Sequence, residues 1–460
     1  MTDFETLRKS YTEAKQDQVF AFADKLSSAE KDTLARQLEK FDPAEINEIS
    51  AKANSWTAEQ SDVEPLPSGS QASVLTESPE TVAAWRAAGQ AAVKRGEVAI
   101  LLLAGGQGTR LGSSAPKGCY DIGLPSHKSL FQLQAERIAK LGDNVPWYIM
   151  TSGPTRGPTE SFFKEHQYFG LNPKNVVFFE QGTLPCLTKD GKIILESAGK
   201  VSEAPDGNGG VYKALKTGKV LDDMQKRGIK HVHMYCVDNS LVKVGDPVFI
   251  GFSAERKLDV ATKVVRKRSS NEQVGVIASR GGKPSVIEYS EITPELREAR
   301  DPAHPDLLKL RAANIVNHYY SVDFLQASPD LAKHAMPFHV AHKKIPFAGG
   351  AGGETVKPDT PNGIKLEQFV FDIFSEVPLA KFASLEVDRK SEFSPVKNAP
   401  GSAEDSPDTA RHDLLDEGRR WLLAAGAQSA GPTEIAPRVS YDGEGLEKFA
   451  GQAVTEAYIA

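Results

Sequence analysis

The chain has 460 residues, with 55 Lys and Arg against 61 Asp and Glu, so its formal net charge is −6. At about 150 residues per domain this length indicates about three domains and excludes a disulfide-stapled module, and the mildly acidic charge argues against a nucleic-acid-binding protein. Three scattered cysteines, the lack of an apolar run of membrane-spanning length and an N-terminus unlike a signal peptide predict a cytoplasmic enzyme with no membrane partner.

The N-terminal residues 1–60 are predicted to be helical. Apolar residues recur there at helical spacing, and Ser27 and Asp42 are each followed three residues on by a glutamate, as at helix starts. A polar connector rich in proline and serine follows over residues 61–78. It ends at a Ser-Pro pair, which begins a further helix.

From residue 96 onward, buried strands and helices alternate. Strands are predicted at 98–104, 146–151, 176–179 and 231–237, with helices such as 129–141 and 212–224 between them. This alternation predicts an α/β fold, namely an open, mixed but mostly parallel sheet with helices on both faces. Ligands bind at the carboxyl ends of the strands of such a sheet, so the loops that follow them are where a site is expected.

The rest of the chain contains fewer signals. Residues 274–279 and 283–289 flank Arg-Gly-Gly and predict a hairpin, and the aromatic run 367–374 is interpreted as core. A second polar connector is predicted at 398–412, before a helix through Trp421. The expected divisions are a helical N-terminal module (1–95), a central catalytic domain (96–380) and a C-terminal domain (381–460).

A glycine-rich loop directly follows the first strand of the predicted sheet. Its glycines, Gly105, Gly106 and Gly108, allow backbone amides to approach phosphate oxygens closely. Arg110 and Lys117 add positive charge a few residues later. A plain tight turn is the alternative, but an apolar strand before the loop and cations after it favour a polyphosphate site.

The spacing of the loop distinguishes it from two common nucleotide motifs. A Walker loop needs Gly-Lys-Ser/Thr after a four-residue gap, and none occurs here. A dinucleotide fingerprint needs a third glycine three residues after Gly108, whereas Gly112 comes one residue late. An ATPase of the Walker type and a nicotinamide enzyme therefore both lose support.

The loop and the segments after it resemble those of a known family. Leu103-Ala-Gly-Gly-Gln-Gly-Thr-Arg-Leu-Gly112 and Pro116-Lys-Gly-Cys-Tyr-Asp-Ile-Gly-Leu-Pro125 are similar to motifs of the eukaryotic UDP-N-acetylhexosamine pyrophosphorylases. The resemblance continues in order through Trp147-Tyr-Ile-Met-Thr-Ser152, Gln181-Gly, Pro205-Asp-Gly-Asn-Gly-Gly210, Tyr235-Cys-Val-Asp-Asn239, Asn314-Ile-Val-Asn-His318, Asn362-Gly-Ile-Lys-Leu-Glu367 and Phe393-Ser-Pro-Val-Lys-Asn398. It implies a Rossmann-like nucleotidyltransferase fold of the glycosyltransferase-A-like kind.

The resemblance also implies a role for each matching residue. The implied catalytic residues are Arg110, Lys117 and Lys397. The implied UTP-binding residues are Leu103, Ala104, Gly105, Gly106, Lys117, Gln181, Gly207, Asp238 and Lys365. The implied sugar-phosphate-binding residues are Asn208, Gly275, Glu288, Asn314 and Lys397.

Two of these residues have side chains whose chemistry suits the implied ligand. The carboxamide of Gln181 offers one donor group and one acceptor, which match the edge of uracil. Asp238 directly follows a predicted strand. Its carboxylate suits Mg²⁺ (or Mn²⁺), directly or through water, although it could also bind ribose or cap a turn.

The expected reaction joins UTP and N-acetylglucosamine 1-phosphate, with UDP-N-acetylglucosamine and pyrophosphate as products. The sugar phosphate attacks the α-phosphorus in line, and cations neutralise the charge that develops. Two alternatives stay open: a UDP-glucose or broad UDP-sugar pyrophosphorylase, and a catalytically silent nucleotide-binding relative. The motifs at 205–210 and 314–318 favour the N-acetylhexosamine branch. The oligomeric state, a monomer or a homodimer, is left open.

Overall fold

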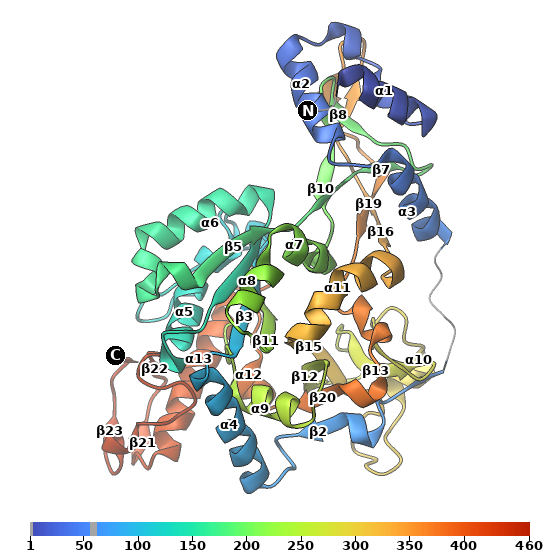
Figure 1. Cartoon of the computed structure of the whole chain (residues 1–460). Coiled ribbons are helices and arrows are strands. Elements are labelled where there is room, and N and C mark those ends of the chain that lie inside the picture. The colour runs from blue at the N-terminus through green and yellow to red at the C-terminus, as the bar shows by residue number, and fades with distance from the viewer. Residues whose placement is uncertain (1–2, 56–61) are drawn as a thin grey trace. The chain divides into compact units, whose positions relative to one another are not determined.

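The computed structural model describes residues 3–55 and 62–460, so the end of the predicted N-terminal helical region and the first residue of the connector lie outside the described residues. Contacts group the chain into two compact units (Figure 1). Unit 1 consists of the described part of Met1–Glu59 with Gln181–Lys213 and Ala332–Asp372. Unit 2 consists of the described part of Gln60–Glu180 with Ala214–Leu331 and Ile373–Ala460. No helix in the described ranges is long and apolar enough to cross a membrane.

The core of unit 2 is one large sheet (Figure 1). Along its main path the strand order is β2-β20-β12-β15-β11-β3-β4-β5. Only β15 on this path runs antiparallel to its neighbours, so the sheet is mostly parallel, as predicted. The strands are β2 (Gln71–Ser73), β3 (Val98–Leu103), β4 (Trp147–Thr151), β5 (Val176–Glu180), β11 (His231–Cys236), β12 (Val260–Arg266), β15 (Ala312–Ser321) and β20 (Phe382–Glu386).

Helices cover both faces of this sheet. Two adjacent residues of β4 show this, since adjacent residues of one strand point to opposite faces. Trp147 of β4 packs on Phe131 of α5 (Leu130–Leu141) and Phe163 of α6 (Gly153–Glu165). The next residue, Tyr148, donates a hydrogen bond to Asp223 of α8 (Val220–Lys226) at 2.8 Å. All six residues of β3 are buried, as expected of a central parallel strand.

Two helices of unit 2 pack so closely that their backbones are in contact. A Cβ added to Gly89 of α4 (Pro79–Lys94) would lie 1.9 Å from the Pro247 carbonyl oxygen. One added to Gly251 of α9 (Pro247–Glu255) would lie 1.8 Å from the carbonyl oxygen of Trp85. Glycine is therefore required at both crossing points. The predicted Ser-Pro start of α4 is confirmed, since Ser78 caps the helix.

The predicted hairpin is confirmed and extends the sheet. Strands β13 (Val276–Arg280) and β14 (Lys283–Ile287) pair directly, and the two residues between them, Gly281 and Gly282, have φ of 56° and 78°. Two left-handed residues form the type of turn that fits the strand twist. β1 (Val63–Glu64) pairs with β13.

Two predicted boundaries and one predicted core segment differ in part from the structure. The predicted helix 212–224 is two helices, α7 (Val211–Thr217) and α8, because Lys219 adopts the left-handed conformation at φ 56°. The second connector ends earlier than predicted, since Ser406 caps α13 (Pro407–Ala424). The aromatic run at 367–374 is core only in part: Val370, Ile373 and Phe374 are buried, whereas Phe369 and Phe371 are partly buried.

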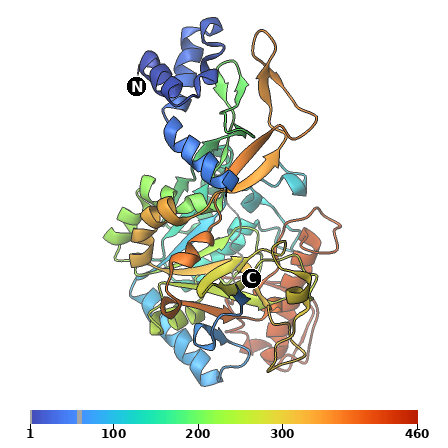
Figure 2. The same cartoon turned by 90° about the vertical axis from the view of Figure 1, so that its right-hand side faces the viewer.

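Unit 1 brings together three segments far apart in sequence (Figures 1 and 2). The helices α1 (Phe4–Glu13), α2 (Ser28–Leu38) and α3 (Pro43–Ser55) contribute to one apolar cluster with residues such as Leu187 and Leu366. The predicted capping at Ser27 and Asp42 is confirmed. The strands of this unit are β6 (Thr183–Pro185), β7 (Leu187–Thr188), β8 (Leu195–Ser197), β9 (Lys200–Val201), β10 (Glu203–Pro205), β16 (His339–Lys343), β17 (Phe347–Gly349), β18 (Glu354–Val356) and β19 (Gly363–Glu367).

The two units differ from the three consecutive divisions expected from the sequence. The helix α4 packs in the core of unit 2, where Trp85 meets Phe252, and not with the N-terminal helices. The C-terminal residues also belong to unit 2, with a cluster of their own around Leu422 and Leu446. The remaining α-helices and strands are α10 (Pro294–Glu298), α11 (Val322–Ala335), α12 (Arg389–Glu392), β21 (Ser429–Ala430), β22 (Glu434–Ile435), β23 (Ala453–Val454) and β24 (Tyr458–Ile459).

Candidate functional site

The glycine-rich loop begins where β3 ends. Leu103 and Ala104 are buried, and the chain reaches the surface at Gly106. The hydroxyl of Ser152, at the end of the neighbouring strand β4, donates a hydrogen bond to the Gly105 carbonyl oxygen at 2.7 Å. The amide of Lys117 donates to the Gly106 carbonyl oxygen at 3.1 Å, so the end of the loop is tied back to its beginning.

The two cations of the loop stand on separate short 3₁₀ turns. Arg110 is exposed on the turn Thr109–Leu111, and Lys117 is half-buried at the start of the turn Lys117–Cys119. A Cβ added to Gly118 would lie 2.2 Å from the ring of Phe131 on α5. The backbone beside Lys117 is therefore pressed against the core, which fixes the origin of the lysine side chain.

Charged residues gather at the carboxyl end of β11. Burial raises the pKa of the Cys236 thiol to about 12; Asp238 adds to this rise, whereas Lys397 and Lys117 oppose it. The charges of two lysines and one carboxylate, from three separate segments, thus all influence the pKa of the Cys236 thiol. The backbone joins two of them, since the amide of Val396 donates to the carbonyl oxygen of Asp238 at 2.9 Å. We call Lys117, Asp238 and Lys397 the β11 group.

Asn239, which ends the motif Tyr235–Asn239 but was assigned no role from the sequence, connects the segments of the β11 group. Its side-chain nitrogen donates to the Glu392 carbonyl oxygen at 2.7 Å, and its side-chain oxygen accepts from the amide of Ser394 at 3.0 Å. The residue is buried. Asn239 therefore holds the chain after Asp238 against the chain that leads to Lys397.

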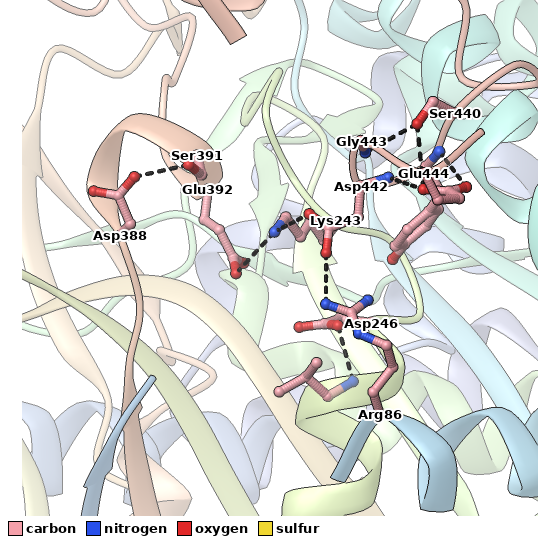
Figure 3. Close-up of polar contacts among 12 residues, drawn as sticks. Arg86, Lys243, Asp246, Asp388, Ser391, Glu392, Ser440, Asp442, Gly443 and Glu444 are labelled. Atoms are coloured by element: carbon pink, nitrogen blue, oxygen red, sulfur yellow. Dashed lines mark hydrogen bonds and ion pairs between the residues drawn. The ribbon is translucent and has the colours of Figure 1, made fainter. Parts of the chain in front are cut away.

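A network of buried charges lies beneath this connection. Lys263, which is fully buried, forms an ion pair with Asp246 at 2.6 Å and a second with Glu392 of α12. Figure 3 shows how Glu392 and Asp442 flank Lys243, to which Asp442 is paired at 2.6 Å. The network joins β12, the start of α9, α12 and the C-terminal residues, so it fixes the position of the segment that carries Lys397.

The sugar-side residues of the prediction also meet in unit 2. The amide of Asn314 on β15 donates to the Gly275 carbonyl oxygen at 2.8 Å. A Cβ added to Gly275 would lie 3.0 Å from a carboxylate oxygen of Glu288. The Asn314 side-chain oxygen accepts from the amide of Val316 at 3.0 Å, which leaves its side-chain NH₂ to donate.

Unit 1 holds the other four predicted residues. The side-chain nitrogen of Gln181 donates to the carbonyl oxygen of Gly207 at 3.3 Å, and the side-chain oxygen of Asn208 accepts from the amide of Val370 at 2.9 Å. Gly207 has φ 86°, and an added Cβ would lie 2.3 Å from the Gln368 carbonyl oxygen, so only glycine fits there. Lys365 is half-buried on β19.

Similarity to known proteins decides the family. A model of the UTP–glucose-1-phosphate uridylyltransferase family matches residues 39–403. The UDP-N-acetylglucosamine pyrophosphorylase of Saccharomyces cerevisiae is 50% identical, with 98% of each chain covered. The solved UDP-N-acetylglucosamine pyrophosphorylase of Trypanosoma brucei is 33% identical with a TM-score of 0.85, covering 97% of this chain and 95% of that one.

The chain belongs to the UDP-N-acetylhexosamine pyrophosphorylase family. A more distant likeness, to the UDP-glucose pyrophosphorylase of Leishmania major, shows the shared fold alone, at 18% identity and a TM-score of 0.59 over 86% of this chain and 76% of that one. The predicted family and fold class are both confirmed.

The pyrophosphorylase has one carboxylate at the position where a metal is expected. In the described part of the chain, no group of three or more His, Cys, Asp or Glu residues is arranged to hold a metal ion. Asp238 is half-buried at the end of β11. One carboxylate fits Mg²⁺ only if substrate phosphates and water supply most of the coordination, which is the usual arrangement for this ion in phosphoryl-transfer enzymes.

Cys119 is expected to react slowly with thiol reagents, although it lies two residues from Lys117. Burial raises the pKa of its thiol to about 12, so the reactive thiolate is scarce at neutral pH. We predict that iodoacetamide inactivates wild type and Cys119→Ser at equal, slow rates. Rapid inactivation that disappears in Cys119→Ser would show instead that this thiol controls the glycine-rich loop.

Proposed function

We propose that this pyrophosphorylase transfers the uridylyl group of UTP to N-acetylglucosamine 1-phosphate and releases pyrophosphate. The observation that carries the proposal is the β11 group, whose three charges all act on the Cys236 thiol, and Cys236 pairs with Leu103 at the start of the glycine-rich loop. Relatives that span nearly the whole chain bear the name of this activity.

The chemistry requires positioning and charge stabilisation. The sugar phosphate is ionised at neutral pH and attacks the α-phosphorus of UTP without a general base, while pyrophosphate leaves from the far side. Lys117 and Arg110 are assigned to the departing phosphates, and Lys397 to the attacking phosphate. Amides of Gly105 and Gly106 complete the phosphate contacts, next to Leu103 and Ala104. A bound Mg²⁺ or Mn²⁺ at Asp238 supplies further neutralisation of the phosphate charge.

The residues of unit 1 are assigned to the nucleotide and the sugar phosphate. Gln181 and Gly207 contact the uracil ring, Lys365 contacts a nucleotide phosphate, and Asn208 contacts the sugar phosphate. The support is the family membership together with the tight placement of Gly207, whose carbonyl oxygen accepts from Gln181.

Gln181→Ala is expected to raise KM for UTP about tenfold and to relax the preference for UTP over CTP. Hydrogen bonds to a base edge contribute about 1–1.5 kcal/mol each when the alternative is water. The check is kcat/KM for both nucleotides. Discrimination against CTP equal to that of wild type would contradict the assignment.

The sugar is assigned from the cluster of Gly275, Glu288 and Asn314. The NH₂ of Asn314 can donate to an acetyl carbonyl oxygen, a group that glucose 1-phosphate lacks. A pyrophosphate-release assay with N-acetylglucosamine 1-phosphate, N-acetylgalactosamine 1-phosphate and glucose 1-phosphate tests this. Turnover of the N-acetylated sugars at least tenfold above glucose 1-phosphate is expected. Equal turnover would favour a broad UDP-sugar enzyme, and UTP binding without turnover a silent relative.

The setting of the enzyme is proposed to be the cytoplasm, where both substrates would be free small molecules. Nucleic acid and membrane are not proposed as partners.

A further inference from the structure

A buried carboxyl group lies behind the residue assigned to the uracil. Asp206 is 7% exposed and precedes Gly207. A Cβ added to Gly210 would lie 2.0 Å from its Oδ1, and one added to Gly182 would lie 2.5 Å from its Oδ2. The carboxyl group therefore occupies the space that two glycines leave open, one beside Gln181 and one in the loop after Asp206.

The backbone fixes this carboxyl group in place. The amide of Asp206 donates to the Gly182 carbonyl oxygen at 3.2 Å, and the Asp206 carbonyl oxygen accepts from the amide of Gln368 at 2.9 Å. Within the described ranges, Oδ1 of Asp206 has no hydrogen-bond partner. An unpartnered buried carboxylate oxygen is costly, and a native protein that keeps one usually has a functional reason.

The neighbour of Asp206 with a movable hydrogen-bonding group is Gln181. The side-chain nitrogen of Gln181 donates to the Gly207 carbonyl oxygen, and hydrogen bonding from Gln181 favours the ionised form of Asp206. Both partners are acceptors, so both select the orientation in which the NH₂ of the carboxamide points toward them. The carboxamide oxygen then points the other way.

We propose that Asp206 is a positioning residue that sets the orientation of the Gln181 carboxamide and thereby the preference for UTP over CTP. The inference rests on the assignment of Gln181 to the base. Uracil presents an N3–H donor to the outward oxygen of Gln181, whereas cytosine presents a lone pair at N3 and is repelled. A protonated Asp206 can donate to the oxygen of Gln181, which permits the reversed carboxamide and weakens the distinction, while the Gly207 carbonyl oxygen continues to favour the original orientation.

Protonation of Asp206 is expected near neutral pH. Burial raises its pKa to about 7, and Lys213 of α7, its own backbone and Gln181 oppose that rise. Glu367 of β19 is a further charged residue at this loop, its Cβ 3.1 Å from the position of a Cβ on Gly207. The preference for UTP should therefore be highest above pH 7 and should fall as the pH drops through 7.

The test measures the ratio of kcat/KM for UTP to that for CTP. Phosphates of the nucleotide and the sugar titrate near pH 6, but this pH effect cancels in the ratio because both nucleotides carry the same triphosphate. In wild type we expect a fall of about tenfold from about pH 8.5 to about pH 6, following one ionisation. Asp206→Asn should show a low ratio at every pH, because its amide can pair with either orientation. Asp32→Asn, at an exposed position of α2, should keep the wild-type profile.

Stability gives a second readout that does not depend on turnover. The pKa of Asp206 is higher in the folded chain than in the unfolded chain, so its ionisation costs stability as the pH rises from about 4 to about 7. Asp206→Asn lacks this cost, and its melting temperature relative to wild type should rise between pH 5.5 and pH 8.5. If the melting temperature of the variant does not rise relative to wild type, the claim that Asp206 carries a buried charge above pH 7 is contradicted.

The outcomes separate the two proposals. UTP turnover in wild type with a UTP-to-CTP ratio that does not change with pH overturns the role of Asp206 and leaves the proposed function standing. No pyrophosphate release from UTP at any pH overturns the proposed function, and this inference with it. If Asp206→Asn does not fold, the wild-type profile alone decides.

Discussion

Lys117→Ala is expected to lower kcat about a thousandfold, or about 4 kcal/mol in the barrier, while the fold stays intact. The reason is that the lysine stands at the end of the glycine-rich loop with its backbone fixed by the Gly118–Phe131 contact, and that its charge, like that of Lys397, lowers the pKa of the Cys236 thiol at the end of β11. A charge held in place beside departing phosphates stabilises the transition state more than the ground state. The KM for UTP should therefore change less than kcat.

Two variants accompany this measurement. Lys164→Ala removes an exposed lysine from α6 and should leave kcat unchanged. Lys117→Arg keeps the charge but replaces a compact ammonium with a planar fork, so partial activity is expected. Far-UV circular dichroism and thermal melting establish that each variant is folded. Near-normal turnover in a folded Lys117→Ala enzyme would remove Lys117 from the mechanism.

Lys263→Met is expected to destabilise the protein by about 3–5 kcal/mol, because it leaves Asp246 and Glu392 buried without their shared cation. Burial raises the pKa of Glu392, and Lys263 and Lys243 oppose that rise. Without Lys263, the carboxyl groups would take up a proton more readily in the folded chain. The loss of stability should therefore be smaller at about pH 5 than at about pH 8.

The measurement is urea unfolding of wild type and variant at both pH values. Lys267→Met, on a half-buried lysine just beyond the end of β12, is the matched control and should change stability by less than about 1 kcal/mol. A Lys263→Met protein as stable as wild type would mean that the buried charges do not hold α12 and the Lys397 segment together.

Local signals in the sequence predicted the fold well. The run at 98–104 is apolar throughout, so a buried parallel strand was the natural interpretation, and β3 is such a strand. The capping pair Ser27 and Glu30 and the Arg-Gly-Gly turn are complete within a few residues, so they too could be found without a structure. The resemblance added the residues of the β11 group and the Gly275, Glu288 and Asn314 cluster, which the structure brings together.

Features that depend on distant partners could not be predicted. A lysine in a strand would normally be expected to face solvent. Lys263 is instead buried, because its carboxylate partners come from positions 17 and 129 residues away. Asp206 lies in Pro-Asp-Gly-Asn-Gly-Gly, a sequence typical of an exposed turn; it is buried because Gln368, 162 residues on, returns to the loop at Asp206. The catalytic role that the resemblance implies for Arg110 stays a prediction.

The grouping of the chain into two units also depends on contacts between residues that are far apart in the sequence. A division read along the sequence assumes that neighbours in the chain share a core. Here the N-terminal helices share theirs with Leu187 and Leu366, while α4 packs on α9. The interpretation of 1–95 as one module joined helices with different cores.

The central claim is uridylyl transfer by attack on the α-phosphorus, and isotope position tests it most directly. The enzyme is incubated with N-acetylglucosamine 1-phosphate and UTP labelled with ³²P at either the α or the γ position, and the products are separated. We predict that the α label appears in UDP-N-acetylglucosamine and the γ label in pyrophosphate. A γ label attached to the sugar, or no labelled nucleotide sugar from a folded enzyme supplied with Mg²⁺, would contradict the account.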